Sequence, residues 1–346
     1  MRGQTHSKAV SYTIVAIIMI ISTTLIWMVT YTAYAANEPI RLGVKVWAPD
    51  FFSYLAQEKG FFDRNKVNVE LTLVQDYHQL LNNYADGNYD GMIPVYSDLI
   101  YQNSNGVDSK VVYAIDFSNT GDVIIGKVNS SSNSNTTLAD FKGKKISVQE
   151  IYGFSQLFVL KALEKVGLGE GDVEFATVSV QNVTQELEEG RIDAGHIYQP
   201  YTTEALKNGY QILFAAGSIP GTITDVLVFR SDVIQQRLQD IQAVIKSIIE
   251  ALSYYETHKL ESLKIMSSKS GISEQEIKNG FDSVTLPSLK ENFVNVMNSK
   301  SNETVSLFSS GKYIAQFFVD RGQIGEYPDL SQIIASKFVN ALYQGQ

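Results

Sequence analysis

Residues 87–96 read GNYDGMIPVY and residues 190–201 read GRIDAGHIYQPY, and the order of residue types in the two stretches is the same. Before each stretch a helical pattern runs into the first glycine, which suits the left-handed end of a helix, and a short apolar strand follows. A proline, a tyrosine and a second helical pattern come next. The repeat predicts two regions of like construction, although helix, glycine and strand also follow one another in other α/β chains.

Outward from these stretches, short β-rich runs alternate with amphipathic helical segments, starting at Ile40. This order favours an α/β protein with mostly parallel sheets. Beyond Arg230 the pattern changes to long helices, because apolar residues from Ile234 to Tyr255 recur at helical spacing. The polar stretch NSSSNSNTT at residues 129–137 cannot bury itself, so we expect a surface loop there.

The composition excludes several classes of protein. The chain has 346 residues, of which 44% are hydrophobic and 19% charged, so it is long and apolar enough for two folded domains. It contains no cysteine, which excludes disulfides, thiolate metal sites and cysteine nucleophiles. The net charge of -9 argues against nucleic acid as a partner. The four histidines are scattered and no catalytic sequence motif is present, so we expect no catalytic residues, no metal and no cofactor.

The first forty residues predict the compartment. Arg2 and Lys8 are followed by a stretch without charge from Ala9 to Asn37, and Ala33-Tyr34-Ala35 matches the A-x-A pattern of a cleavage site. This arrangement predicts an export signal over residues 1–35 that is cleaved after Ala35. An uncleaved membrane anchor is the alternative, because the stretch is long enough to span a bilayer. In both cases we expect the body outside the cytoplasm, either secreted, periplasmic or on the outer face of the cell membrane.

Several ordered motifs resemble those of one protein family. They are LGV and WAP within residues 42–49, LAQEKGFF at 55–62, DFSNTGD at 116–122, LADFKGK at 138–144 and IDAGHIYQP at 192–200. In this order they resemble the sulfonate, nitrate and thiamine-pyrimidine group of extracytoplasmic solute-binding proteins, over about residues 38–321. Each motif is weak by itself, and the set together is fairly specific.

The resemblance implies a type-2 periplasmic-binding-protein fold, in which two α/β lobes with mostly parallel sheets are joined by two hinge strands. We place the hinge strands at Val123–Val128 and Asp225–Arg230. Lobe one would comprise residues 38–121 and 231–346, and lobe two residues 122–230 including the hinge strands. The implied function is capture of a small molecule in the interlobe cleft by hinge closure, for delivery to the permease and ATPase subunits of an ABC importer. We expect a monomer that contacts the membrane only through a retained N-terminal segment.

The site residues come from two sources: the rule that α/β folds bind ligands at the carboxyl ends of their strands, and the matched segment 116–122, which in the resembling family leads into the hinge and implies Asp116, Ser118, Asn119 and Thr120. Trp47, at the end of the first predicted strand, is the strongest candidate, because aromatic walls are common in ligand clefts. Tyr96 and Tyr198 follow strands in the two repeated stretches, and either could instead be a core tyrosine. Ser155 suits the cap of the following helix as well as a ligand. The predicted ligand contacts are Trp47, Tyr96, Asp116, Ser118, Asn119, Thr120, Tyr152, Phe154, Ser155, Tyr198 and Asp225.

The sequence leaves the class of ligand open. No arginine falls inside the matched cleft segments, and Lys45 is the nearest cation. Aromatic residues together with Asp98, Asp116 and Asp225 suit a flat nitrogen heterocycle with amino donors, so a thiamine-precursor aminopyrimidine is the preferred ligand. An aliphatic sulfonate, taurine or nitrate is the alternative. Two other functions stay open, a ligand-sensing ectodomain on an uncleaved anchor and, last, an enzyme on the same fold, although enzymes related to this family rely on cysteine or histidine clusters.

Overall fold

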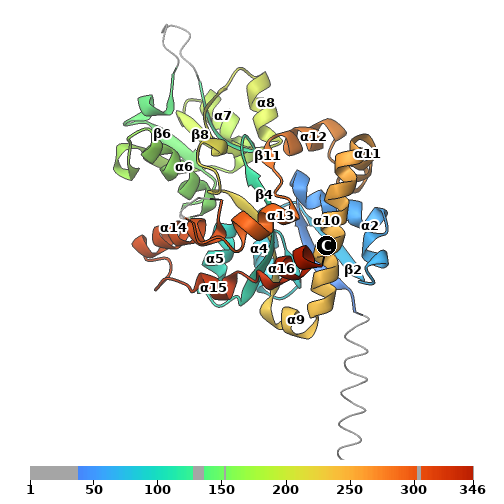
Figure 1. The fold of residues 1–346 in the computed structure, drawn as a ribbon. Coiled ribbons are helices and arrows are strands. Elements are labelled where there is room, and N and C mark those ends of the chain that lie inside the picture. Colours follow the sequence, from blue (N-terminus) through green and yellow to red (C-terminus); the bar gives the residue numbers. More distant parts are fainter. Residues whose placement is uncertain (1–37, 128–135, 152, 302–304, 346) are drawn as a thin grey trace, which may run out of the picture.

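The computed structural model describes residues 38–127, 136–151, 153–301 and 305–345. The expected export signal, most of the polar stretch 129–137 and Tyr152 lie outside these ranges. Two β-sheets flanked by helices form two lobes, which lie one above the other in Figure 1. We call the part built on the six-stranded sheet lobe one and the part built on the five-stranded sheet lobe two.

The sheet of lobe one has the strand order β11-β4-β10-β3-β1-β2. β1 is parallel to β2 and β3, whereas β10 is antiparallel to β3 and β4, and β11 is antiparallel to β4. Leu42 and Val44 of β1 are fully buried, which explains the apolar start of the chain's folded part. The strands are β1 (Ile40–Lys45), β2 (Val69–Val74), β3 (Gly91–Met92), β4 (Ser109–Ser118), β10 (Thr224–Arg230) and β11 (Val284–Thr285).

The sheet of lobe two has the strand order β7-β6-β8-β5-β9. β6 is parallel to β7 and β8, whereas β5 is antiparallel to β8 and β9. Both sheets are therefore mixed: each has three parallel strands, and the antiparallel strands adjoin the crossings between the lobes. The strands are β5 (Asp122–Gly126), β6 (Lys145–Val148), β7 (Glu174–Thr177), β8 (Ala194–Tyr198) and β9 (Gln211–Ala215).

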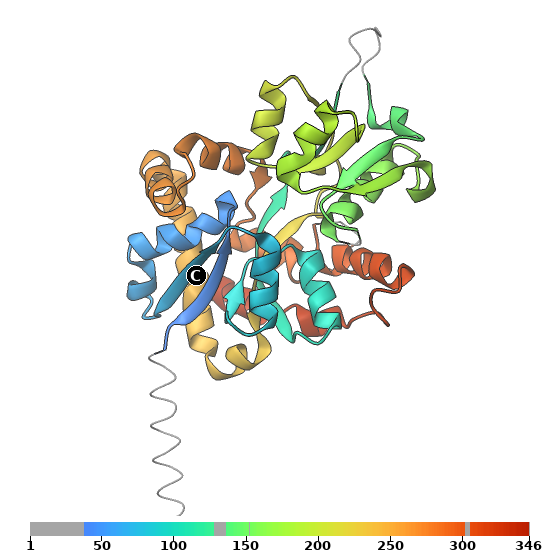
Figure 2. The same ribbon diagram turned by 180° about the vertical axis from the view of Figure 1, so that it is seen from behind.

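Most helices belong to lobe one, because the chain returns there with β10 and stays (Figure 2). The helices before the crossing are α2 (Phe52–Glu58), α3 (Phe61–Arg64), α4 (Tyr77–Ala85) and α5 (Tyr96–Ser104). Those of lobe two are α6 (Phe154–Lys165), α7 (Val183–Glu188) and α8 (Tyr201–Lys207). The later helices are α9 (Ser231–Gln236), α10 (Leu238–Thr257), α11 (Lys259–Ser270), α12 (Glu274–Asp282), α13 (Leu289–Glu291), α14 (Leu307–Asp320), α15 (Leu330–Ile333) and α16 (Lys337–Gln344).

The predicted α/β class with two lobes is confirmed, and the apolar stripe beyond Arg230 is helical. The stripe is divided, however, since α9 ends at Gln236 and α10 begins at Leu238. Within α10, Ile241, Ile245 and Ile248 are buried, as their helical spacing predicts. Within the described ranges, none of the helices combines the length and apolarity that a bilayer span requires.

The chain crosses between the sheets at residues 119–121, from β4 to β5, and at residues 216–223, from β9 to β10. The expected hinge strand Asp225–Arg230 lies entirely in the sheet of lobe one, paired with β3 and β4. The other expected hinge strand begins one residue earlier, as β5, and lies in lobe two. The alternation of apolar residues marked both strands but could not assign them to a sheet, because that depends on their distant partners. The limits of the lobes as units stay a prediction.

Candidate ligand-binding site

A cavity of about 390 Å³ lies between the two lobes. Lobe one contributes the residues just after β1 and β2, which include Trp47 and Tyr77, together with Asp225 of β10. Lobe two contributes Asp122, at the start of β5, and Tyr198, at the end of β8. The carboxyl ends of β1, β2 and β8 therefore meet at the cavity, as expected for parallel strands in an α/β sheet.

The charged floor of the cavity belongs to lobe one. Lys45 Nζ lies 3.1 Å from Asp225 Oδ2 and 3.2 Å from Asp50 Oδ1, and it donates to the carbonyl oxygen of Ile93 at 2.9 Å. An ammonium group has three N–H donors, so these three partners occupy all of them. Burial lowers the pKa of Lys45, but attraction by Asp225, Asp50 and Asp116 outweighs it, so the pKa is raised overall. Lys45 is therefore a cation whose N–H donors are all bound within lobe one.

Trp47 connects the floor to the opposite lobe. Its indole Nε1 donates to Asp116 Oδ2 at 3.1 Å, and its ring meets the Tyr198 ring edge-on at a centroid separation of 6.5 Å. Asp116 is the cross-strand partner of Asp225, and burial together with that like charge holds the pKa of Asp116 well above its usual range. A Cβ on Gly121 would lie 2.8 Å from Trp47 Cη2, so the first crossing needs a glycine where it passes the ring.

The wall of lobe two rests on a buried chain of hydrogen bonds. Asp122 Oδ1 lies 3.1 Å from His196 Nε2, and His196 Nδ1 lies 2.7 Å from Ser155 Oγ. Ser155 Oγ also accepts the main-chain N–H of Gln149 at 2.9 Å. His196 and Ser155 are buried, whereas Asp122 and Gln149 line the cavity. This series of hydrogen bonds therefore begins and ends at residues of the cavity wall.

Two further carboxyl groups lie near the cavity, one on each lobe. Asp98 Oδ2 accepts the Tyr77 hydroxyl at 2.6 Å, and burial raises the pKa of Asp98 to about 7. Glu150 Oε1 accepts the main-chain N–H of Ser155 at 3.2 Å, and burial raises the pKa of Glu150 to about 8. Both groups are therefore partly protonated near neutral pH, in contrast to an exposed carboxylate.

Four of the predicted contacts line the cavity, namely Trp47, Phe154, Tyr198 and Asp225. The other described ones do not. Tyr96 is buried in the core of lobe one, Asp116 lies behind Trp47, and Ser155 lies behind His196. Ser118 Oγ accepts the main-chain N–H of Asp122, Asn119 Nδ2 donates to Thr285 Oγ1, and the main-chain N–H of Thr120 donates to the Ser283 carbonyl. Contact of any of them with a ligand stays a prediction, and Tyr152 lies outside the described residues.

Other lining residues were not predicted from the sequence. Asp122 is the last residue of the matched motif DFSNTGD, so the motif already contained it. Tyr77 and His78 come shortly after the end of β2 at Val74, where the strand-end rule that selected Trp47 would also have found them. The same rule would have found Gln149, which follows β6, and Tyr201, which comes shortly after β8, whereas no comparable signal marked Gln181.

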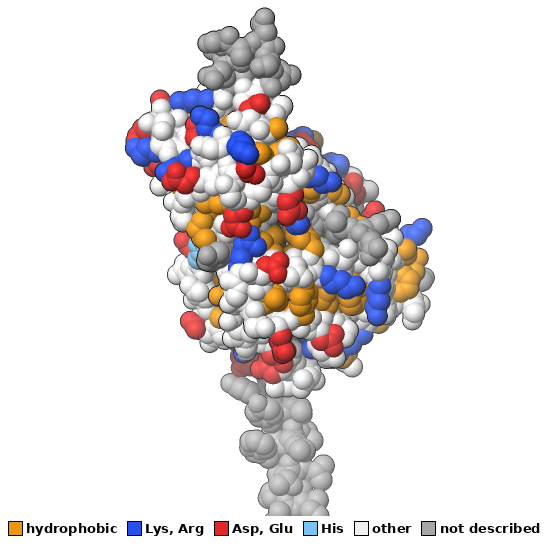
Figure 3. Space-filling view, turned by 90° about the vertical axis from the view of Figure 1, so that its left-hand side faces the viewer, with side chains coloured by type: hydrophobic (Ala, Val, Ile, Leu, Met, Phe, Trp, Pro, Cys, Tyr) orange, Lys and Arg blue, Asp and Glu red, His pale blue; other side chains and the backbone are white. Residues whose placement is uncertain are grey.

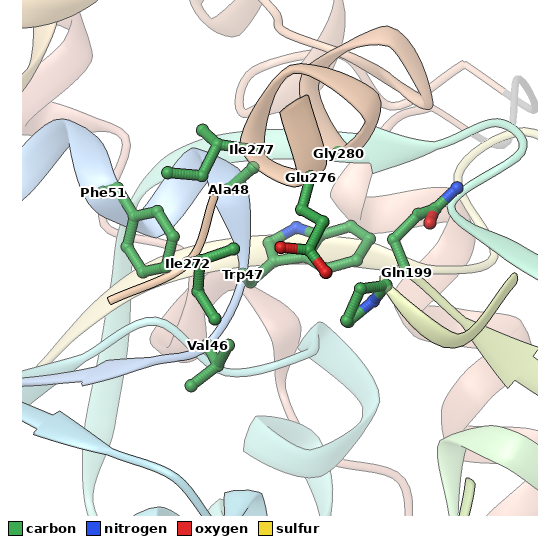
Figure 4. Close-up of a pocket in the computed structure, with 10 residues that line it drawn as sticks. Val46, Trp47, Ala48, Phe51, Gln199, Ile272, Glu276, Ile277 and Gly280 are labelled. Atoms are coloured by element: carbon green, nitrogen blue, oxygen red, sulfur yellow. The ribbon is translucent and has the colours of Figure 1, made fainter. Parts of the chain in front are cut away.

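A narrow crevice of about 20 Å³ lies beside Trp47 and is lined by residues of α12 and by Gln199 and Pro200, which follow β8. Figure 4 shows the Glu276 side chain of α12 over the indole of Trp47, with Gln199 of lobe two next to them. Asn279 Nδ2 of α12 donates to Thr203 Oγ1 of α8 at 3.3 Å. The crevice has room for one water at most, so the larger cavity is the candidate site.

The lobes also meet between α6 and α14, where they line a groove of about 300 Å³. Arg321 of lobe one forms an ion pair with Glu170 of lobe two, and Lys161 Nζ lies 4.4 Å from the centroid of the Tyr313 ring. Figure 3 shows this side of the molecule, with hydrophobic and charged side chains together along the boundary between the lobes. This groove is lined mainly by groups that already contact one another.

The two-lobed fold and the cavity between the lobes place this protein in the class of proteins with the periplasmic-binding-protein fold. The chain belongs to the NMT1/THI5-like family, whose sequence profile matches residues 50–262. The sequence has no significant match among curated proteins.

Solved structures share the fold at low sequence identity. The periplasmic aliphatic sulphonate binding protein SsuA of Escherichia coli is 18% identical, with a TM-score of 0.68 over 86% of this chain and 92% of that one. A ligand binding component of an ABC-type import system from Staphylococcus aureus is 14% identical, with a TM-score of 0.66 over 88% and 98%. The desulfurization enzyme DSZB is 15% identical, with a TM-score of 0.65 over 90% and 100%. The fold therefore occurs in binding proteins and in an enzyme.

Proposed function

We propose that this protein is the extracytoplasmic substrate-binding component of an ABC importer. It captures a small molecule between its lobes by hinge closure and presents it to permease and ATPase subunits. The likeness to the import component of Staphylococcus aureus and the uncharged N-terminal stretch support this proposal. A cavity that draws residues from both lobes supports it further, because a ligand there stabilises the closed arrangement.

The preferred ligand is an aminopyrimidine precursor of thiamine or a similar heteroaromatic molecule. The observation that carries this preference concerns Lys45, the only lysine or arginine among the described residues that line the cavity. Its N–H donors are already bound to partners within the protein. Asp76, Asp122 and Asp225 also line it, so the described wall carries more carboxylates than cations. A sulfonate or nitrate would meet these carboxylates without a free cation, and desolvation of the anion would be poorly compensated.

The aromatic walls suit the same class of ligand. Trp47 and Tyr77 of lobe one face Phe154 and Tyr198 of lobe two, and the Tyr77 and Phe154 rings are 6.2 Å apart, edge to face. Flat rings bind well between aromatic side chains, and amino groups on their edges find acceptors in the carboxylates. The cavity volume of about 390 Å³ is within the usual range for small-molecule sites.

Isothermal titration calorimetry of the purified protein tests this proposal. We expect binding heat with the aminopyrimidine precursor of thiamine and none with ethanesulfonate, taurine or nitrate. Heat with a sulfonate and none with the pyrimidine would contradict the ligand but support a binding protein. Chemical conversion of a bound ligand would instead indicate an enzyme. Permease and ATPase genes next to this gene would support the importer over a sensor.

A further inference from the structure

The register of two strands in lobe two brings Asp122 and His196 to one face of the sheet. Asp122 of β5 lies opposite Tyr198 of β8, and Ile124 lies opposite His196. Side chains at every second strand position share a face, so Asp122 is the diagonal neighbour of His196. The His196 ring packs between the rings of Phe154 and Phe158, at centroid separations of 5.7 and 5.2 Å.

The hydrogen-bond partners fix the proton of the His196 ring. Ser155 Oγ already accepts the N–H of Gln149, and its own proton finds His196 Nδ1 as the acceptor at 2.7 Å. A carboxylate oxygen accepts hydrogen bonds, so we assign the donor of the 3.1 Å contact with Asp122 Oδ1 to Nε2–H of His196. An imidazole that donates from Nε2 and accepts at Nδ1 satisfies each group in this series of hydrogen bonds.

This arrangement differs from that of a hydrolytic triad in one respect. Ser155 is fully buried at the start of α6, beneath the His196 ring, and its oxygen already has two partners. A nucleophile needs access to its substrate. This series of hydrogen bonds therefore serves to hold Asp122, which lines the cavity.

Asp122 and Asp225 belong to opposite lobes and line the same cavity. Asp225 is bound by Lys45, whereas the described side-chain partner of Asp122 is His196. Burial raises the pKa of Asp225, attraction by Lys45 opposes this, and the negative charge of Asp122 adds to the increase. Approach of the two lobes therefore brings two carboxylates together, which is unfavourable unless a donor group lies between them.

We propose that His196 is a positioning residue that holds the carboxyl group of Asp122 in place at the cavity wall, so that closure selects a ligand with amino N–H donors between Asp122 and Asp225. This inference rests on the proposed function and adds a selection rule to it. The amino group of the ligand is the feature that the rule detects, since it offers two N–H donors, one for each carboxylate, whereas a hydroxyl at the same ring position offers one donor and a carbonyl none.

The test compares the aminopyrimidine with the same ring bearing a hydroxyl in place of the amino group. In the wild type we expect the amino compound to bind at least about tenfold more tightly, as for a hydrogen bond to a charged group. His196→Phe keeps a flat ring but removes the donor, so it should weaken binding of the amino compound by about tenfold and abolish the discrimination. His196→Gln keeps an N–H donor and should retain most of both. His258→Phe, at an exposed histidine between α10 and α11, is the matched control and should bind as the wild type does.

A second readout separates this inference from the proposed function. Nitrogen NMR of the ligand-free protein should show His196 protonated at Nε2 and unprotonated at Nδ1. A folded His196→Phe variant with unchanged discrimination, or a ring proton on Nδ1, would overturn the inference while leaving the binding protein intact. If that variant does not fold, Asp122→Asn decides in its place, and retained discrimination would again overturn it. A wild type that binds neither pyrimidine would overturn the proposed ligand and the selection rule, and the NMR result would still decide the positioning.

Discussion

The two walls of the cavity use their charged groups differently. On lobe one, Lys45 contacts Asp50, Asp225 and a main-chain carbonyl, so its charge is paired within the protein. On lobe two, Asp122 is supported from behind by His196 and faces the cavity. We infer from this difference that lobe one supplies a floor of paired charges and lobe two the carboxylate that meets the ligand on closure. Changes on the first wall should therefore affect stability most, and changes on the second should affect binding.

The largest effect is expected from Lys45→Met. This substitution leaves Asp50 and Asp225 buried without their cation, which should lower the free energy of unfolding by about 3–5 kcal/mol. Urea unfolding measures the loss. Lys59→Met is the matched control, because Lys59 pairs with the exposed Glu261 and should cost less than about 1 kcal/mol. Equal and small losses in the two variants would contradict the description of the floor.

The next effect is a dependence of stability on pH. The pKa of Asp98 is raised to about 7 and that of Glu150 to about 8, so the folded protein keeps these protons at pH values where the unfolded chain has released them. Stability should therefore fall as the pH rises from 5 to 8, by at most about 1.4 kcal/mol per pH unit for each group. Asp98→Asn should remove the part of the slope that Asp98 contributes up to about pH 7, and Glu150→Gln the part that Glu150 contributes up to about pH 8, so that below pH 7 each variant keeps the slope of the other group. Urea unfolding at a series of pH values checks both, and a wild type that gains stability over this range would contradict the shifts.

A smaller effect is expected from Trp47→Phe, which probes the contact between the walls. The phenyl ring can still face Tyr198, but Asp116 loses the indole N–H as its donor. We expect a loss of about 1–2 kcal/mol in unfolding free energy and a drop of about tenfold in ligand affinity. Urea unfolding and calorimetry measure the two quantities. If both the unfolding free energy and the ligand affinity stay unchanged, a role of Trp47 in ligand binding is contradicted.

The smallest effect is expected from Tyr96→Phe. The Tyr96 hydroxyl is buried and has no hydrogen-bond partner in the described part of the chain, so its removal should change the free energy of unfolding by less than about 0.5 kcal/mol. Ligand affinity should stay within about twofold, because Tyr96 does not line the cavity. A large loss of affinity in calorimetry would contradict this expectation and indicate that Tyr96 contributes to ligand binding.

The repeated stretches show how far sequence patterns reach. They correctly predicted a strand and a helix in each lobe, because glycine, proline and apolar spacing act locally. They did not separate Tyr96 from Tyr198. β3 ends at Met92, so Tyr96 begins α5 and turns into the core, whereas β8 extends to Tyr198 and carries it to the cavity. The length of a strand depends on its partners in the sheet, which the local pattern does not contain.

The charged part of the site was even less accessible from sequence. Lys45 was expected near the ligand, but its ion pairs with Asp50 and Asp225 depend on the strand order, in which β3 lies between β1 and β10. The pairing of Asp116 with Asp225 likewise depends on a long-range antiparallel register. The strand-end rule located the cavity, and tertiary contacts decided which polar groups are available inside it.

Hydrogen exchange measured by mass spectrometry, with and without the aminopyrimidine, tests the central claim most directly. If the lobes close on a ligand, exchange should slow in residues 45–54 of lobe one and in residues 195–206 of lobe two together. The surface formed by α3, α10 and α16 should not change. Slower exchange in one lobe alone, or only at that distant surface, would contradict a binding site between the lobes.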